Sequence, residues 1–138
     1  MLTFKFFPLD SDNTRAIGGE IFMSSAFGIA LTALKAFDIK LDVNANNIVN
    51  VNTDGFKKTR VNLQEAYPGG VQVTLEQVRT QGISLGTNEQ TGKERESSNV
   101  NLAEEFVDQI VTRYAFESNV LTIKTADDMQ KTLMDIIT

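Results

Sequence analysis

The sequence predicts a mainly α protein with a small β segment, in which paired, coiled-coil-like N- and C-terminal helices are joined by a short strand-rich region. Two long stretches with apolar residues at helical spacing occupy the ends of the chain, and a short stretch between them alternates apolar and polar residues. The 138 residues suffice for one domain, and 41% of them are hydrophobic, so the chain must bury surface somewhere.

The first predicted helix begins near Ile21, just after Gly18 and Gly19. A polar run from Asn50 to Gly55 ends it, because Asn and Gly tolerate left-handed geometry and side-chain amides satisfy free carbonyls. Its apolar residues share one face of a helix: Met23, Ala26, Phe27, Ala30, Leu34, Phe37, Leu41, Ala45 and Ile48.

The second predicted helix begins near Asn101, where Asn101 and Glu104 have the spacing of an N-cap and its reciprocal partner. Its first half carries the apolar face Ala103, Phe106, Val107, Ile110, Tyr114 and Leu121. Beyond about Phe116 the apolar set rotates to Phe116, Val120, Ile123, Ala126 and Leu133. We therefore expect the first half to contact the partner helix of the same chain and the second half to contact a neighbouring subunit.

The segment between the helices carries weaker signals. Val71, Val73 and Leu75 alternate with polar residues after a turn at residues 68–70, which predicts a half-buried strand. Short strands are also predicted near residues 82–85 and 61–63, and residues 87–97 resemble a flexible connector because they contain no large apolar side chain.

These signals divide the chain into four parts. Residues 1–22 form an N-terminal extension, 23–52 the N-terminal helix, 53–97 the strand-rich middle with its connector, and 98–138 the C-terminal helix.

Composition excludes several classes of function. Without cysteine, histidine or tryptophan the chain offers no thiol nucleophile, no Cys/His metal site and no imidazole acid–base chemistry. We therefore expect no cofactor and no enzyme activity. The net charge of −5 and the pI near 4.7 argue against a nucleic-acid partner, and no stretch approaches the roughly 20 apolar residues of a membrane-spanning helix.

Two helices in a hairpin can hide one stripe each, yet both helices carry more apolar residues than that. Ile29, Leu31, Ile39 and Val43 lie off the main stripe of the first helix, and the C-terminal residues Leu133, Met134, Ile136 and Ile137 need a cover. The surplus predicts a protein–protein interface. The alternative is that the middle strands fold over these faces and complete a self-contained core.

Two stretches resemble the signatures of the flagellar rod and hook protein family. Residues 41–58 read LDVNANNIVNVNTDGFKK and are similar to the family's N-terminal signature, with Val49, Val51 and Phe56 as mild departures. Residues 96–111 read ESSNVNLAEEFVDQIV and are similar to its C-terminal signature, Ser-Asn-Val-Asp-Leu-Ala-Glu-Glu. Because the two signatures occur in the correct order at opposite ends, the resemblance extends from about Met23 to the C-terminus.

This resemblance implies a structural subunit that stacks its terminal helices around a central channel. The implied partners are copies of itself, other rod and hook axial proteins and the flagellar export apparatus, with no membrane insertion. The implied location is the periplasmic rod of the basal body, reached without a cleavable signal peptide. The short middle favours a proximal-rod member, and Gly69–Val73 is similar to part of one short type. Residues 1–22 match nothing in the family, so they are either an extension peculiar to this protein or the result of a misplaced start.

The resemblance and the apolar surplus together predict an assembly interface. Asn46 and Asn47 are expected to make lateral contacts, whereas Asn50, Asn52 and Gly55 could simply end the helix. Glu104 and Glu105 are read as partners of the helix dipole rather than as paired catalytic carboxylates. The predicted interface comprises Asn46, Asn47, Ile48, Asn52, Gly55, Phe56, Ser98, Asn99, Val100, Phe106, Ile110, Tyr114, Val120, Ile123 and Leu133.

Two functions remain open at this point. The first is the self-assembling, torque-transmitting rod subunit implied by the resemblance. The second is a soluble helical-hairpin adaptor or export chaperone that covers an amphipathic helix of a flagellar axial protein.

Overall fold

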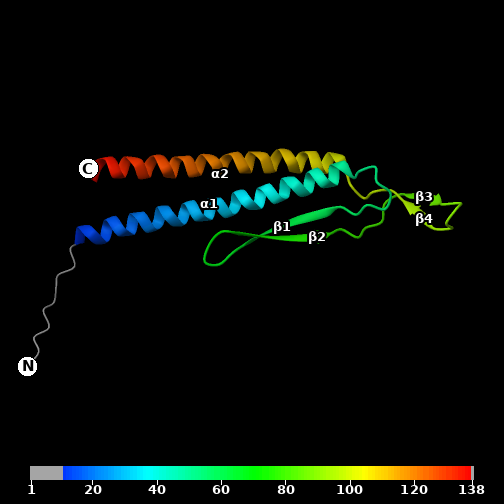
Figure 1. Cartoon of the computed structure of the whole chain (residues 1–138), viewed down its shortest axis with the longest axis horizontal. Helices are drawn as coiled ribbons and strands as arrows, with labels where there is room; N and C mark the ends of the chain where they lie inside the picture. The colour runs from blue at the N-terminus through cyan, green and yellow to red at the C-terminus, as the bar shows by residue number, and fades with distance from the viewer. Residues whose placement is uncertain (1–10, 138) are drawn as a thin grey trace, which may run out of the picture.

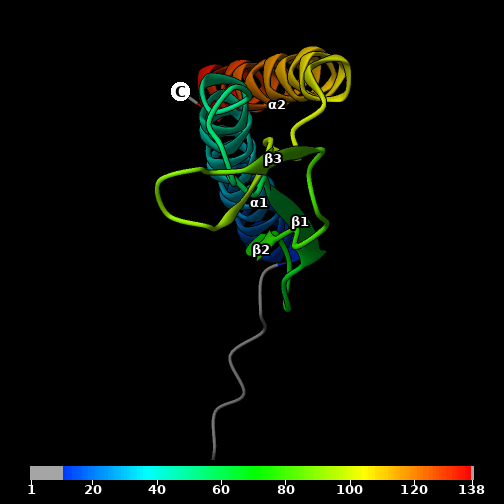
Figure 2. The ribbon, with the colours of Figure 1, turned by 90° about the vertical axis from the view of Figure 1, so that its right-hand side faces the viewer.

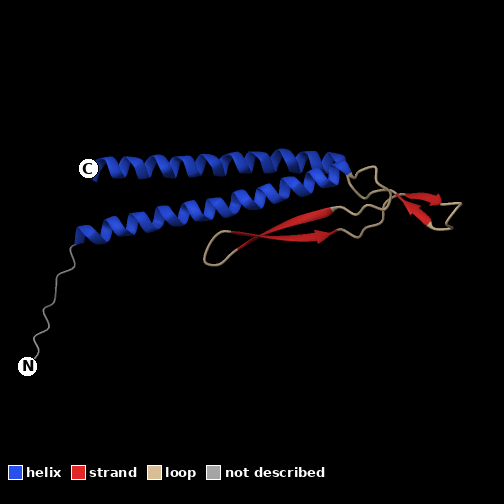
Figure 3. Ribbon diagram, in the orientation of Figure 1, coloured by secondary structure: helices blue, strands red, loops and turns tan. Residues whose placement is uncertain are grey.

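A computed structural model describes the backbone of residues 11–137 and the side chains of residues 26–136. Helix α1 (Ser11–Val49) and helix α2 (Leu102–Ile137) run antiparallel over most of the molecule's length (Figures 1 and 3). Four short strands lie between them in sequence: β1 (Thr59–Glu65), β2 (Val71–Gln77), β3 (Ser84–Thr87) and β4 (Glu94–Glu96). The predicted fold class, paired terminal helices with a small β segment between them, is confirmed.

The elements form three layers. Both views place α1 in the middle, with α2 on one side of it and the β1–β2 hairpin on the other (Figures 1 and 2). The β3–β4 hairpin projects beyond the end at which α1 finishes and α2 starts (Figure 1). The middle segment thus covers one face of α1 and leaves most of α2 uncovered.

Helix α1 is longer at its N-terminus than the sequence pattern indicated. It begins at Ser11, so it runs through Gly18 and Gly19 and includes part of the predicted extension; residues 1–10 of that extension lie outside the described residues. Propagating an existing helix adds one hydrogen bond per residue, so a helix tolerates two glycines at a cost of about 1 kcal/mol each. At the other end α1 finishes at Val49, and Asn50 Nδ2 caps it by donating to the Asn46 carbonyl at 2.9 Å.

Helix α2 begins as predicted, one residue after Asn101. The Asn101 side-chain oxygen accepts the Ala103 amide at 3.1 Å, as an N-cap does, and its amide donates to Glu104 Oε1 at 3.3 Å. The predicted start signal is therefore confirmed, with the Asn101 side chain as the group that meets Glu104.

The strands confirm part of the middle and correct the rest. Strands β1 and β2 pair antiparallel with Val61 opposite Leu75 and Leu63 opposite Val73, on either side of the predicted turn. The prediction of a flexible connector over residues 87–97 is wrong, because part of this segment belongs to strands β3 and β4, which pair antiparallel. Asn88 closes their turn by bonding Lys93 O through its amide and Gly92 N through its carbonyl, and Gly92 has a φ of 65°. Backbone pairing and turn chemistry form this hairpin, so hydrophobic patterning does not reveal it.

The buried core is small and mostly polar. Among the described residues, the buried apolar side chains are Ala30, Ala33 and Ala36, and the buried polar ones are Asn44, Asn47, Glu105 and Thr112. Many large apolar side chains of both helices remain exposed, including Ile29, Leu31 and Ile39 of α1. The middle strands therefore do not complete a self-contained core, and the predicted surplus of apolar surface is present.

The predicted face change in α2 is wrong for the first half of the helix, and in the second half only Val120 and Leu133 of the predicted outward face are exposed. Ile110 in the first half is 55% exposed, whereas Phe116 and Ile123 in the second half are partly buried. In the first half the buried positions are Glu105, whose carboxylate accepts a hydrogen bond from Asn47, and Thr112. The apolar stripe of the first half consequently faces away from α1.

Candidate functional site

Asn47, near the end of α1, joins three elements. Its Oδ1 accepts the Thr59 amide at 3.0 Å and its Nδ2 donates to the Thr59 carbonyl at 2.9 Å. The same Nδ2 donates to Glu105 Oε2 in α2 at 3.2 Å, and the residue is 1% exposed. A carboxamide carries the same donor and acceptor as a peptide group, so Asn47 pairs with the start of β1 as a neighbouring strand would.

Asn99, just before α2, holds the adjacent residue of the chain. Its Oδ1 accepts the Lys58 amide at 2.7 Å, and its Nδ2 donates to the carbonyls of Val78 at 2.8 Å and Thr80 at 3.0 Å. Each signature thus supplies one asparagine that fixes one of two consecutive residues. We call Asn47, Lys58, Thr59, Asn99 and Glu105 the signature junction.

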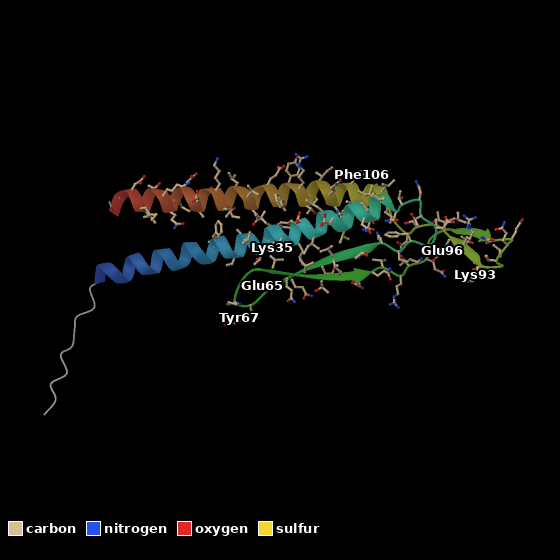
Figure 4. The ribbon with its side chains drawn as sticks, in the orientation of Figure 1. Lys35, Glu65, Tyr67, Lys93, Glu96 and Phe106 are labelled. Carbon is tan, nitrogen blue, oxygen red and sulfur yellow. The ribbon has the colours of Figure 1, made fainter. Side chains whose placement is uncertain are left out.

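Ion pairs surround the signature junction. Lys58 Nζ lies 3.0 Å from Glu104 Oε2, and Lys57 Nζ lies 2.8 Å from Glu96 Oε1, a residue labelled in Figure 4. The hydrogen bonds from these ammonium groups hold the pKa of Glu104 and the pKa of Glu96 below the ordinary value of 4.5. The Lys58–Glu104 pair ties the middle segment to the start of α2, and the Lys57–Glu96 pair ties the residues after α1 to β4.

Gly55 and Asp54 make a third connection between the two signatures. Gly55 donates its amide to the Glu96 carbonyl at 2.7 Å and has a φ of 69°, a conformation that glycine adopts readily. Asp54 accepts hydrogen bonds from the Arg95 guanidinium. The end of α1 and the approach to α2 are therefore joined on both sides of the signature junction.

A small polar cavity lies beside the signature junction. It has a volume of about 60 Å³ and is lined in part by Lys40, Asn44, Glu105 and Asp108. Asn44 is buried there, and its Nδ2 has no hydrogen-bond partner among the residues that the structure describes. The volume suits one or a few water molecules rather than a metabolite. Across the described part of the chain, no group of three acidic, His or Cys side chains could hold a metal ion.

The first half of α2 presents an apolar surface to solvent. Phe106 lies on the side of α2 away from α1 (Figure 4), and Tyr114 is 70% exposed. We call this surface the outer face, and its exposed members are Phe106, Val107, Ile110, Val111, Tyr114 and Leu121. Its contiguous apolar side chains are typical of a surface that another protein covers. Neither helix, over the residues described, has a stretch long and apolar enough to cross a membrane.

The structure brings together part of the predicted interface. Residues 46–56 and 98–100 meet around the signature junction, whereas Phe106, Ile110, Tyr114, Val120, Ile123 and Leu133 are distributed along α2. Asn47 is buried and fully bonded within the chain, so we no longer assign it to lateral contacts between subunits. The other interface assignments remain predictions.

Sequence reasoning missed three members of the signature junction: Lys58, Thr59 and Glu105. Lys58 and Thr59 take part through their backbones, which leave no trace in the choice of side chain. Glu105 was interpreted as a partner of the helix dipole. Its helical spacing could have indicated burial. Glu105 lies on one helix face with Gln109, Thr112 and Phe116, and all four residues are wholly or partly buried.

Two family models match the ends of the chain. The model described as "Flagella basal body rod protein" matches residues 27–57, and the model described as "Flagellar basal body rod FlgEFG protein C-terminal" matches residues 95–136. Together they cover just over half of the chain. The chain belongs to the flagellar basal-body rod protein family.

Curated relatives within the rod protein family are similar to parts of the chain. The flagellar basal-body rod protein FlgG of Buchnera aphidicola subsp. Baizongia pistaciae is 36% identical over 87 residues, which cover 59% of this chain and 34% of the relative. The protein of the same name from Bacillus subtilis is 54% identical over 35 residues, 25% of this chain and 13% of the relative. The chain therefore spans about a third of the first relative and less of the second.

The two family matches divide the signature junction between them. Asn47 lies in the N-terminal match, and Asn99 and Glu105 lie in the C-terminal match. In this rod family member, the hydrogen bond between Asn47 and Glu105 therefore joins the two matched segments directly.

Proposed function

We propose that this chain is a structural subunit of the flagellar basal-body rod. In this proposal it assembles with copies of itself and with other rod and hook axial proteins into a hollow axis that transmits torque. The observation that carries the proposal is the outer face of α2, an apolar surface left uncovered in a chain of the rod family. Passage through the flagellar export apparatus and a periplasmic location in the rod belong to the same proposal.

The polar contact between the helices supports this role. In the first half of α2 the helix turns Glu105 and Thr112 toward the interior and Phe106 and Ile110 toward solvent. A monomer gains hydrophobic stabilisation from the opposite arrangement, so the observed one is favourable where neighbouring chains bury the outer face. The family matches do not favour the adaptor or chaperone alternative.

The proposal is tested by deleting the gene and restoring it with variants of the outer face. We expect the deletion strain to lose swimming and to lack complete basal bodies in electron micrographs, and the unaltered gene to restore both. The double variant Val107→Glu/Tyr114→Glu should fail to restore them although the protein accumulates and is helical, because it places two charges in the surface to be buried.

The matched control is Ser118→Glu, a charge at an exposed polar position of the same helix. It should restore swimming. Motile cells with intact basal bodies in the deletion strain would reject an essential structural role, and full activity of the double variant would reject the outer face as the surface of assembly.

A further inference from the structure

Tyr67 stands at the tip of the β1–β2 hairpin and is 100% exposed (Figure 4). The tip is held to α1, because the Val71 amide donates to Thr32 Oγ1 at 3.0 Å. The loop also closes on itself, since the Ala66 amide donates to the Gly70 carbonyl at 3.0 Å. A Cβ at Gly69 would lie 3.1 Å from the Ile29 side chain, so the loop runs close against the helix. The chain therefore presents a large aromatic ring to solvent from an anchored loop, at little cost in entropy when the ring is bound.

A shallow groove on α2 has the chemistry to receive such a ring. It has a volume of about 390 Å³ and is formed by Phe116, Val120 and Leu121, with Glu117 and Lys124 at its sides. Aromatic and aliphatic side chains offer edge and face contacts to a phenol ring, and a lysine ammonium attracts its face. The groove thus combines an apolar floor with a polar margin, as a tyrosine side chain requires.

The tip and the groove cannot meet within one chain. The pairs Lys40–Asp108 and Asn47–Glu105 set the antiparallel register of the helices, which places the middle of α2 beside the part of α1 that anchors the tip. Figure 1 shows the tip and the middle of α2 at the same position along the long axis, with α1 between them. A second copy beside the first can therefore bring its tip to this groove without sliding along the axis.

Charges beside the tip and the groove are complementary. Glu65 precedes the tip, Lys124 borders the groove, and both are exposed. Within the described residues neither makes an ion pair, although Glu117 of the groove is paired with Arg113 at 2.9 Å. A tip seated in the groove of a neighbour would bring these opposite charges together.

We propose that Tyr67 of one copy docks in the Phe116–Val120–Leu121 groove of the next copy, with Glu65 facing Lys124. The contact joins two different surfaces, so it repeats from copy to copy and generates a ring or a helical assembly rather than a closed pair. It rests on the proposed function, because it specifies how neighbouring copies meet laterally.

The absence of cysteine allows a direct test by disulfide cross-linking. The full-length double variant Tyr67→Cys/Val120→Cys, oxidised in cells that lack the unaltered gene, should give a ladder of dimers, trimers and larger species. Each single variant can give dimers at most, and a mixture of the two single variants should give a mixed dimer. The matched control is Tyr67→Cys/Met129→Cys, which places the second thiol at an exposed apolar position of α2 outside both the groove and the outer face.

A ladder of equal strength from the control pair would overturn the proposal, because the tip would then contact α2 without preference for the groove. Charge reversal gives a second measurement. Glu65→Lys and Lys124→Glu should each lower the ladder yield about fivefold, and the two together should restore it. Failure of the double reversal to restore the yield would exclude the ion pair.

The outcomes separate this inference from the proposed function. If cells need the chain for basal bodies but the groove pair shows no preferential ladder, the structural role stands and the docking of Tyr67 is wrong. If the deletion strain swims normally, the rod role itself is wrong.

Discussion

Asn47 Nδ2 donates a hydrogen bond to Glu105 Oε2 at 3.2 Å, across 58 positions of sequence and inside the interface of the two helices. Both residues are buried, and Asn47 also bonds both backbone groups of Thr59. A buried carboxylate needs a donor, and a buried amide needs partners for all its groups. This one contact therefore fixes the positions of α1, α2 and the start of β1 relative to one another.

Replacing Asn47 should destabilise the chain more than replacing its neighbour. Asn47→Ala removes both bonds to Thr59 and leaves the Glu105 carboxylate without this donor, so we expect a loss of about 3 kcal/mol in the free energy of unfolding. The measurement is urea denaturation followed by circular dichroism. Asn46→Ala is the control, because its exposed side chain accepts a bond from the nearby Asn50 side chain, and it should cost about 0.5 kcal/mol. Equal losses would show that the buried bonds contribute nothing.

Asn99→Ala should loosen the middle segment while leaving the helices paired. The variant removes the acceptor of the Lys58 amide and the donor to the carbonyls of Val78 and Thr80. Hydrogen exchange at the Lys58 amide should become about tenfold faster, with little change in the middle of α2. Ser98→Ala is the control, since its hydroxyl accepts a bond from the nearby Val100 amide. Unchanged exchange at Lys58 would contradict the role assigned to Asn99.

The paired carboxylates make stability depend on pH. The pKa of Glu104 and the pKa of Glu96 are lowered in the folded chain by hydrogen bonds from Lys58 and Lys57. A lowered pKa contributes stability above the unfolded value, and that contribution is lost as the pH falls through the folded value. The melting temperature should therefore fall as the pH drops from about 5 through 4.5 and below.

The double variant Lys57→Gln/Lys58→Gln should weaken this acid dependence. Added salt should weaken it as well, because the Glu104 carboxylate is exposed and the Glu96 carboxylate is partly exposed. Lys93→Gln serves as the control, since Lys93 makes no ion pair among the described residues. An acid profile that is the same in the double variant and the unaltered chain would rule out these two pairs as its source.

Ile110 and Ile123 should respond differently to a charge. Ile110→Asp places a carboxylate on the exposed outer face, so the free energy of unfolding should change by about 0.5 kcal/mol while assembly is lost. Ile123→Asp places it beside α1, where partial burial should cost about 2 kcal/mol. Thermal unfolding measures the first quantity and restoration of basal bodies the second. If Ile110→Asp destabilised the chain more than Ile123→Asp, the result would support the burial of Ile110 against α1 that the sequence predicted.

Two glycine substitutions should have opposite effects. Apart from the adjoining backbone, no described atom lies within 4 Å of a Cβ added at Gly28 or Gly55, but Gly55 has a φ of 69° and Gly28 lies inside α1. Gly55→Ala should destabilise by about 1 kcal/mol, because alanine is strained at this φ. Gly28→Ala should stabilise by about 0.5 to 1 kcal/mol, because alanine loses less entropy in a helix. Denaturant unfolding of both variants measures the difference, and a shared sign would contradict the backbone explanation.

The sequence by itself determined the two helices, the start of α2, the β1–β2 hairpin and the family. These features depend on residues that are close together in the sequence, so they can be predicted from it. They are the helical periodicity, the N-cap at Asn101, the turn at residues 68–70 and the two signatures. The sequence also predicted the surplus of apolar surface, because each helix carries more apolar residues than a two-helix hairpin can bury.

Tertiary structure alone decided which face of each helix is buried. Asn47 and Glu105 are separated by 58 positions, and their contact turns α2 so that its polar series lies inside and the outer face lies outside. Periodicity assigns an apolar stripe to the interior by default, so it placed Ile110 inside and Ile123 outside. The structure departs from that default, because Asn47 supplies the donor that the buried Glu105 carboxylate needs, and the isoleucine is left exposed.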